Sequence, residues 1–170
     1  VSKLFSHSDR IVKQELSFIH YFQCDPTTIY GSLNYDRRHQ LKFMLYLTNF
    51  ESSQDGAFHA IPKSNTFGKL MYRNSWKNAL SLETDDFNEI EKNALLVPDN
   101  DPRYRSLPFR LMEDNIPITG LNLSEASPIT GEAGSLIIFD THVIHSGGLV
   151  GKSHERKTIR LHSFPYDPSL

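Results

Sequence analysis

The sequence predicts a mostly β fold, and three features of the chain support that prediction. Short apolar segments rich in β-branched and aromatic residues recur along it, separated by glycine, proline, asparagine and serine. The length of 170 residues suits one globular domain with a substantial core. No internal repeat, heptad pattern or low-complexity segment suggests another architecture. We therefore expect a single β-rich domain over residues 1–170.

The predicted strands fall into two groups, one in each half of the chain. Each segment combines strand-forming side chains with turn-forming residues at its ends. The predicted strands are residues 18–24, 29–35, 41–48, 57–61, 116–123, 135–139 and 158–164.

Between the two strand groups lies a region of different composition, residues 66–113. Within it, Thr84 can cap a helix over the sequence DDFNEIEKNALL, which has acidic residues in its first turn and Pro98 just beyond its end. A proline-rich, charged loop, VPDNDPRYRSLPFR, follows. An insertion of this kind often covers a pocket as a lid, and a solvated connection is the alternative.

The composition excludes several classes of protein. A hydrophobic content of 38% and a formal net charge of -2 are typical of a soluble protein without nucleic-acid partners. No apolar run approaches the roughly 20 residues of a membrane span, and no signal-peptide pattern is present. The single cysteine, Cys24, cannot form an internal disulfide, which favours the reducing cytoplasm. A start at Val1 rather than methionine is compatible with a trimmed chain or a part of a longer protein.

Polar residues lead into the predicted strand over residues 41–48. Asn34 and Asp36 are two positions apart, and alternate residues of an extended segment share a face, so both side chains can contact one ligand. The alternative is a turn in which Asp36 pairs with Arg37 or Arg38, or caps local backbone amides.

A second polar cluster follows the predicted strand over residues 135–139. The stretch GSLIIFDTHVIHSGG contains His142 and His145, and the two glycines after His145 permit close approach of the backbone to a ligand. Arg156 and Arg160 come next, at the start of the last predicted strand. The alternatives are a buried histidine bonded to backbone and arginines exposed in a basic loop.

Together these segments resemble the phytanoyl-CoA hydroxylase-like family of iron(II)- and 2-oxoglutarate-dependent dioxygenases. The resemblance rests on NYDRRHQLKFMLYLTNFESSQDGAFHAIPKSN and on GSLIIFDTHVIHSGGLVGKSHER, and it covers about residues 17–164. It implies a double-stranded β-helix, a cupin-like jelly roll of two sheets, with a helix and loop insertion at residues 66–113. Such enzymes hold their metal with two histidines and one carboxylate.

The resemblance also implies roles for individual residues. Asp36 matches the carboxylate ligand and His145 the distal histidine ligand. Arg156, eleven positions after His145, matches the arginine whose bidentate fork holds the far carboxylate of 2-oxoglutarate, and Arg160 is its competitor. His142 ranks below His145 as a ligand because it lacks the flanking glycines.

The strand over residues 41–48 is similar to the wall that contacts the co-substrate in this family, which makes Lys42 and Tyr46 candidate co-substrate residues. The remaining histidines are interpreted as ordinary surface or core residues: His7, His20, His59, His154 and His162.

One position departs from the family pattern, because Asn34 stands where the family has its first histidine. A neutral amide oxygen is a poorer iron(II) donor than imidazole. Three outcomes are open: a weak site with Asn34 or water as the third ligand, recruitment of His39, or loss of the metal. The sequence IPKSN also replaces the family's Pro-Gly-Ser-His-like ending.

The resemblance implies an oxygenase that uses iron(II), 2-oxoglutarate and dioxygen to hydroxylate a small organic or lipid-like substrate, with decarboxylation to succinate and CO2. A catalytically impaired jelly-roll binding domain that has lost iron through Asn34 is the alternative from another class. A cupin-like metal isomerase or lyase is a third, and it does not need Arg156 as a clamp.

Overall fold

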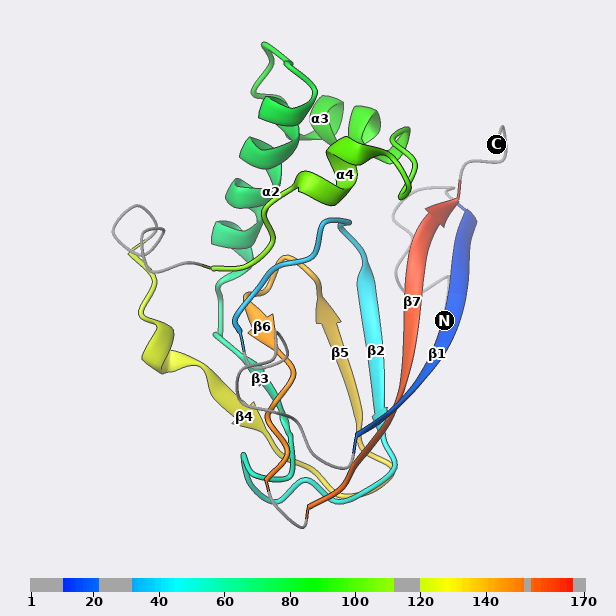
Figure 1. The fold of residues 1–170 in the computed structure, drawn as a ribbon, viewed down its shortest axis with the longest axis vertical. Helices are drawn as coiled ribbons and strands as arrows, with labels where there is room; N and C mark the ends of the chain where they lie inside the picture. The colour runs from blue at the N-terminus through cyan, green and yellow to red at the C-terminus, as the bar shows by residue number, and fades with distance from the viewer. Residues whose placement is uncertain (1–10, 22–31, 112–119, 152–153, 167–170) are drawn as a thin grey trace.

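The structure is a computed structural model, and it describes residues 11–21, 32–111, 120–151 and 154–166. Two antiparallel sheets form the body of the molecule, and the α-helices gather at one end of them (Figure 1). Within the described residues the sheets do not close into a barrel.

The larger sheet has the strand order β1-β7-β2-β5. Its register places Lys42 opposite both Phe139 and His162, and Met44 opposite Arg160. Because directly opposite residues share a face, these side chains lie on one side of the sheet. The strands are β1 (Ile11–Tyr21), β7 (Arg156–Tyr166), β2 (Leu41–Tyr46) and β5 (Leu136–Asp140).

The smaller sheet has the order β4-β3-β6, with β4 (Ser127–Ile129), β3 (Phe58–Ala60) and β6 (His145–Ser146). Isolated bridges extend it past β6, first to Asn34 and then to Arg110. Phe58 of this sheet packs with Met44 and Tyr46 of the larger one in a buried core, so these side chains define the inner face of each sheet.

The helices are α2 (Asn65–Ala79), α3 (Phe87–Leu95) and α4 (Pro102–Ser106), and a short 3-10 turn, η3 (Leu123–Glu125), precedes β4. Tyr72 and Trp76 of α2 and Ile90 of α3 lie in a second buried core that also contains Tyr35. Among the described helices, none is both long and apolar enough to cross a lipid bilayer.

Most predicted strands are confirmed. The predictions over residues 41–48, 57–61, 135–139 and 158–164 correspond to β2, β3, β5 and β7. Strand β1 starts earlier than the segment predicted over residues 18–24. Residues 22–24, with Cys24, and His7 lie outside the described residues.

Other predicted elements were wrong in type or place. Residues 32–35 form no strand beyond the bridges of Asn34, and residues 120–123 form none, because the strand there, β4, begins after η3. Residues 29–31 and 116–119 lie outside the described part. The cap of α3 is Asp86, not Thr84, since the carboxylate of Asp86 accepts from the Asn88 amide at 2.9 Å.

Helix α2 was not predicted, so the fold is a mixture of sheets and helices rather than almost all β. Its buried residues, Gly68, Tyr72 and Trp76, recur every four positions, which is helical spacing. Of the three helices described within this region, α3 corresponds to the helix predicted over DDFNEIEKNALL.

Candidate functional site

The segment that carries Asn34 and Asp36 runs extended between two other parts of the chain. On one side, Asn34 and His145 exchange backbone hydrogen bonds of 2.8 and 2.9 Å, and the Asp36 amide donates to Thr141 O at 3.2 Å. On the other side, the Tyr35 amide donates to Phe109 O at 2.9 Å. This pairing brings two stretches that are over a hundred residues apart into one site.

Alternate side chains of this segment take opposite sides. The Tyr35 hydroxyl donates to Pro108 O at 2.7 Å and lies 2.9 Å from Ser75 Oγ of α2. The Trp76 indole donates to Arg37 O at 3.2 Å. The helices thus hold Tyr35 and the neighbouring backbone, which leaves Asp36 facing the sheets.

Asp36 and His145 face each other at the end of the inner face. Asp36 Oδ1 lies 3.5 Å from His145 Nε2. His145 Nδ1 lies 2.7 Å from Val143 O, and a carbonyl only accepts, so Nδ1 donates to it and Nε2 is the nitrogen that faces Asp36. Fixing one ring nitrogen on a backbone carbonyl is how proteins commonly orient a metal-binding histidine.

The carboxylate of Asp36 is held ionised. Burial raises the pKa of Asp36, but the adjacent His145 ring and the Lys42 ammonium outweigh burial and hold it below its usual range. Lys42 Nζ pairs with Asp36 Oδ2, and Gln40 Nε2 donates to the same oxygen at 3.4 Å. Oδ1 is the oxygen that faces His145.

These donors fit a divalent metal. Two ligands with bonds of about 2.1 Å stand roughly 3.0 to 3.4 Å apart in octahedral or tetrahedral geometry. The 3.5 Å between Asp36 Oδ1 and His145 Nε2 is close to that spacing and longer than an ordinary hydrogen bond. A divalent metal that displaced any proton from Nε2 would have both donors facing it.

Asn34 joins the two donors through its backbone. Its direct pairing with His145 places both side chains on the same face of the sheet. The side-chain Nδ2 of Asn34 donates to Ser32 O at 3.0 Å, which leaves Oδ1 as its possible metal donor. The predicted trio of Asn34, Asp36 and His145 is brought together.

Arg156 is buried deeper between the sheets. Only 5% of its surface is exposed, Nη1 donates to Gly148 O at 3.4 Å, and Nη2 lies 3.8 Å from Met44 Sδ. The guanidinium therefore lies beside Met44, which is the next residue after Lys42 on the inner face of β2. Arg160 lies opposite Met44 and is only partly buried.

Tyr46 lies fully buried on the same face, but its hydroxyl is engaged within the protein. It donates to Ile129 O at 2.8 Å and accepts from the Phe58 amide at 3.1 Å. Burial raises the pKa of Tyr46, so the phenol stays neutral. Any contact of Tyr46 with a ligand must use its ring rather than its hydroxyl.

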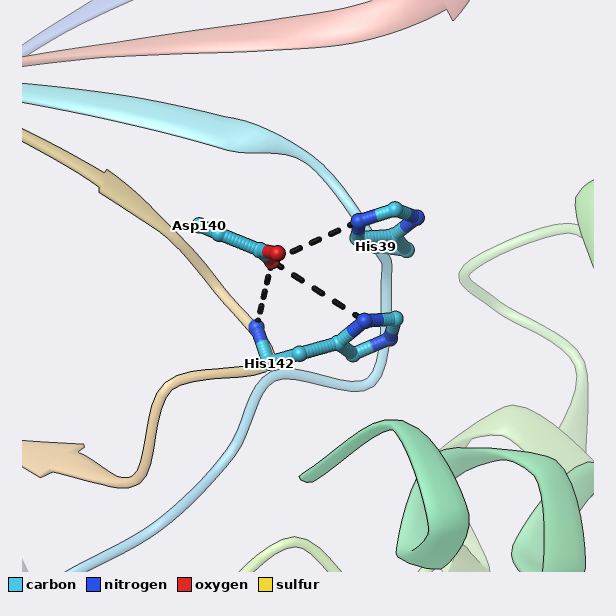
Figure 2. A group of neighbouring side chains, drawn as sticks. All are labelled: His39, Asp140 and His142. Atoms are coloured by element: carbon cyan, nitrogen blue, oxygen red, sulfur yellow. Dashed lines mark hydrogen bonds and ion pairs between the residues drawn. The ribbon is translucent and has the colours of Figure 1, made fainter. Parts of the chain in front are cut away.

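A second group of metal-binding side chain types consists of His39, Asp140 and His142 (Figure 2). One donor atom from each lies within 4.8 Å of the others, and two histidines with a carboxylate are a set that suits iron(II). His39 Nε2 is 3.3 Å and His142 Nδ1 3.9 Å from Asp140 Oδ1. The three residues are thus a candidate metal-binding triad.

The present arrangement of this triad favours an ion pair. The rings of His39 and His142 stack at 3.9 Å with an interplanar angle of 10°. Parallel rings cannot both aim an in-plane lone pair at one ion, so a shared metal requires one ring to turn. His39 Nδ1 also lies 2.9 Å from Glu91 Oε1, so both of its nitrogens face carboxylates.

The pKa values of the two rings diverge. Burial lowers the pKa of His39, but hydrogen bonds to Asp140 and Glu91 outweigh it and raise the value to about 9. Burial and the neighbouring His39 lower the pKa of His142 to about 4. A charged His39 therefore lies against a neutral His142 and connects α3 to the end of β5.

The sequence predictions did not assign Asp140 to any site and considered His39 only as a substitute ligand. A signal was present, because Asp140 and His142 are two residues apart at the end of a predicted strand. Their grouping with His39 depends on the pairing of Leu41 with Asp140, which spacing along the chain does not reveal.

Comparisons with known proteins add little to this geometry. No family model matches the chain, and no curated protein matches it. Among solved structures, the crystal structure of EvdMO1 is similar, with 13% sequence identity and a TM-score of 0.47. The match covers 93% of this chain but only 28% of the EvdMO1 chain. A likeness at this level assigns no function.

Proposed function

We propose that the protein is an iron(II)- and 2-oxoglutarate-dependent oxygenase similar to the phytanoyl-CoA hydroxylase-like family. The convergence of Asp36 and His145 supports this proposal most directly: an oxygen of the ionised Asp36 carboxylate and the imidazole Nε2 of His145 lie 3.5 Å apart. A second contact fixes each donor: Asp36 Oδ2 pairs with Lys42, and His145 Nδ1 donates to Val143 O.

In this proposal Asp36 and His145 are the metal ligands, and Asn34 occupies the place of the third through its oxygen or a water molecule. Bound iron and 2-oxoglutarate would supply the oxidising chemistry, ending in a hydroxylated substrate, succinate and CO2. The protein's own residues would bind and orient the co-substrate and the substrate, and they would exclude water.

Arg156 is the proposed clamp for the far carboxylate of 2-oxoglutarate. Its guanidinium lies beside Met44, which is the next residue after Lys42 on the inner face of β2. A short dicarboxylate that extends inward from Asp36 and His145 would therefore contact it. Its near-complete burial favours it over Arg160, because a desolvated guanidinium binds a carboxylate strongly. Tyr46 would contribute a wall through its ring.

We further propose that the two sheets are part of a jelly roll and that α2, α3 and α4 form a lid. The helices gather at one end of the sheets (Figure 1), and hydrogen bonds of Ser75 and Trp76 to Tyr35 and Arg37 place α2 beside Asp36, which supports the lid. A small organic or lipid-like substrate would bind beneath them. The single cysteine favours a reducing compartment, so we expect a cytoplasmic location.

The test is an anaerobic titration with iron(II) and 2-oxoglutarate, followed by the visible charge-transfer absorption of the chelate. A band that is present in the wild type and absent from Asp36→Ala and His145→Ala is the expected result. Absence of the band in the wild type at millimolar iron contradicts the proposal.

A second function is favoured by one specific observation. The Lys42 ammonium already satisfies Asp36 without a metal, as expected in a binding domain that has lost iron through Asn34. Asn34→His separates the two: if iron binding and succinate formation appear only in that variant, the native chain is the impaired binding domain.

A further inference from the structure

Lys42 contributes a positive charge beside the proposed metal ligands. Its ammonium pairs with Asp36 Oδ2, and the two side chains are only 10% and 17% exposed. A buried ammonium is stable only beside a compensating charge or hydrogen-bond acceptors. In the structure, that charge is the carboxylate of Asp36.

Asp36 therefore presents its two oxygens to different partners. Oδ2 contacts Lys42 and Gln40, whereas Oδ1 faces His145 Nε2. A divalent ion between Oδ1 and His145 would draw on the same carboxylate charge that holds Lys42. It would also stand close to the ammonium, and like charges at short range in a partly buried site repel strongly.

Further basic side chains lie on this face. The register places His162 directly opposite Lys42. Arg160 lies two residues before His162 on β7, opposite Met44. Burial, together with Lys42 and Arg160, lowers the pKa of His162 to about 4. Because Lys42 and Arg160 both lie on this face, a metal ion alone would add positive charge to a region that already holds two cationic side chains.

An anion that arrives with the metal removes this conflict. A metal-bound carboxylate of the co-substrate would lie within reach of the ammonium and replace the charge that the metal takes from Asp36.

We propose that Lys42 couples metal binding to co-substrate binding, so that the metal binds weakly alone and tightly only together with the anionic 2-oxo acid. This inference rests on the proposed function, because it takes Asp36 and His145 as the ligands. Lys42 is then a positioning residue whose charge sets the order in which the site fills. Coupling is reciprocal, so the metal must strengthen co-substrate binding by the same factor.

The experiment is calorimetric titration with Mn(II), a redox-inert stand-in for iron(II), with and without 2-oxoglutarate. Lys42→Met keeps the length and apolar stem of the side chain but removes its charge, and Lys42→Arg keeps the charge. Lys77→Met, which removes a lysine from the surface of α2, is the matched control for loss of one positive charge.

Lys42→Met is expected to bind Mn(II) alone roughly 10-fold more tightly than the wild type, and to lose most of the extra affinity that 2-oxoglutarate confers, within the usual range of coupling factors. Lys42→Arg and Lys77→Met are expected to behave as the wild type. Lys42→Gln serves as a second neutral variant if Lys42→Met fails to fold, as judged by far-ultraviolet circular dichroism.

The two ideas fail differently. Equal Mn(II) affinity and equal coupling in the wild type and in the neutral variants overturn the role of Lys42 but leave the metal site intact. If no variant binds Mn(II) with or without 2-oxoglutarate, the proposed function fails and the coupling fails with it. Mn(II) binding that appears only in the neutral variants supports the role of Lys42.

Discussion

Two histidine–carboxylate pairs lie close to the ends of β2 and β5, and they differ in the second contact of the histidine ring. In the Asp36–His145 pair, the second ring nitrogen donates to a backbone carbonyl, and Nε2 faces the carboxylate. In the His39–Asp140 pair, the second nitrogen faces another carboxylate, that of Glu91. His145 therefore faces one carboxylate, whereas His39 lies between two.

The comparison teaches that residue type alone does not identify a metal centre. A histidine between two carboxylates keeps its proton, and an ion must displace that proton before it can bind. A histidine oriented by a backbone carbonyl keeps one nitrogen for a metal, and at His145 that nitrogen faces a single carboxylate. The two pairs therefore differ in the group that contacts the second ring nitrogen, which is a carbonyl for His145 and a carboxylate for His39.

The largest expected effect is on metal binding, and it tests the comparison directly. Asp36→Ala and His145→Ala should each weaken Mn(II) binding by roughly 100-fold or more, because each removes a ligand. His39→Ala and Asp140→Ala should change it by less than about 5-fold, since neither is a ligand in this proposal. Titration calorimetry measures all four. The reverse pattern would make the His39 group the metal centre.

Asn34→His should strengthen metal binding by roughly 10- to 100-fold, because it supplies an imidazole beside His145 in place of an amide. The backbone pairing of residue 34 with His145 directs the new ring to the correct face. Asn74→His, on the exposed surface of α2, is the control for a histidine that meets no ligand. An unchanged affinity in Asn34→His would show that position 34 is not part of the site.

Gly68→Ala should disturb the His39 group while leaving the Asp36–His145 pair able to bind metal. A Cβ at Gly68 would lie 1.7 Å from His142 O, so α2 must move away from the sheet. We expect a loss of about 2 kcal/mol in the free energy of unfolding, as for other overpacked sites. Urea denaturation measures this loss. Leu70→Ala, at an exposed position of the same helix, should cost much less.

The smallest expected effect is on the pH dependence of stability. The pKa of His39 is raised from 6.5 to about 9 in the folded protein, so its stabilising contribution is complete below pH 6.5 and is lost as the pH rises through 9. Because the side chain is 34% exposed, we discount this contribution to about 1 kcal/mol. Urea denaturation between pH 6 and 10 measures it. His39→Gln should flatten the profile, and an identical slope in that variant would contradict the ion pair.

Much of the sheet structure was predictable because strands carry local signals. The apolar runs of β2 and β5 and the branched residues of β7 mark these strands in the sequence. Helix α2 was not predicted, although its buried residues Gly68, Tyr72 and Trp76 recur at helical spacing. Residues 32–35 were predicted as part of a strand, but only the isolated bridges of Asn34 pair them.

By itself, the sequence determined that alternate residues such as Asn34 and Asp36 share one face of an extended segment, and only its resemblance to the dioxygenase family related them to His145 and Arg156. Tertiary structure alone decided the partners of those residues. Asp36 meets Lys42 and His145, and His39 meets Glu91, only after segments distant in the chain pack together. Alternation is a local property of backbone geometry, whereas the charge state of a buried group depends on whatever the fold brings within a few ångströms.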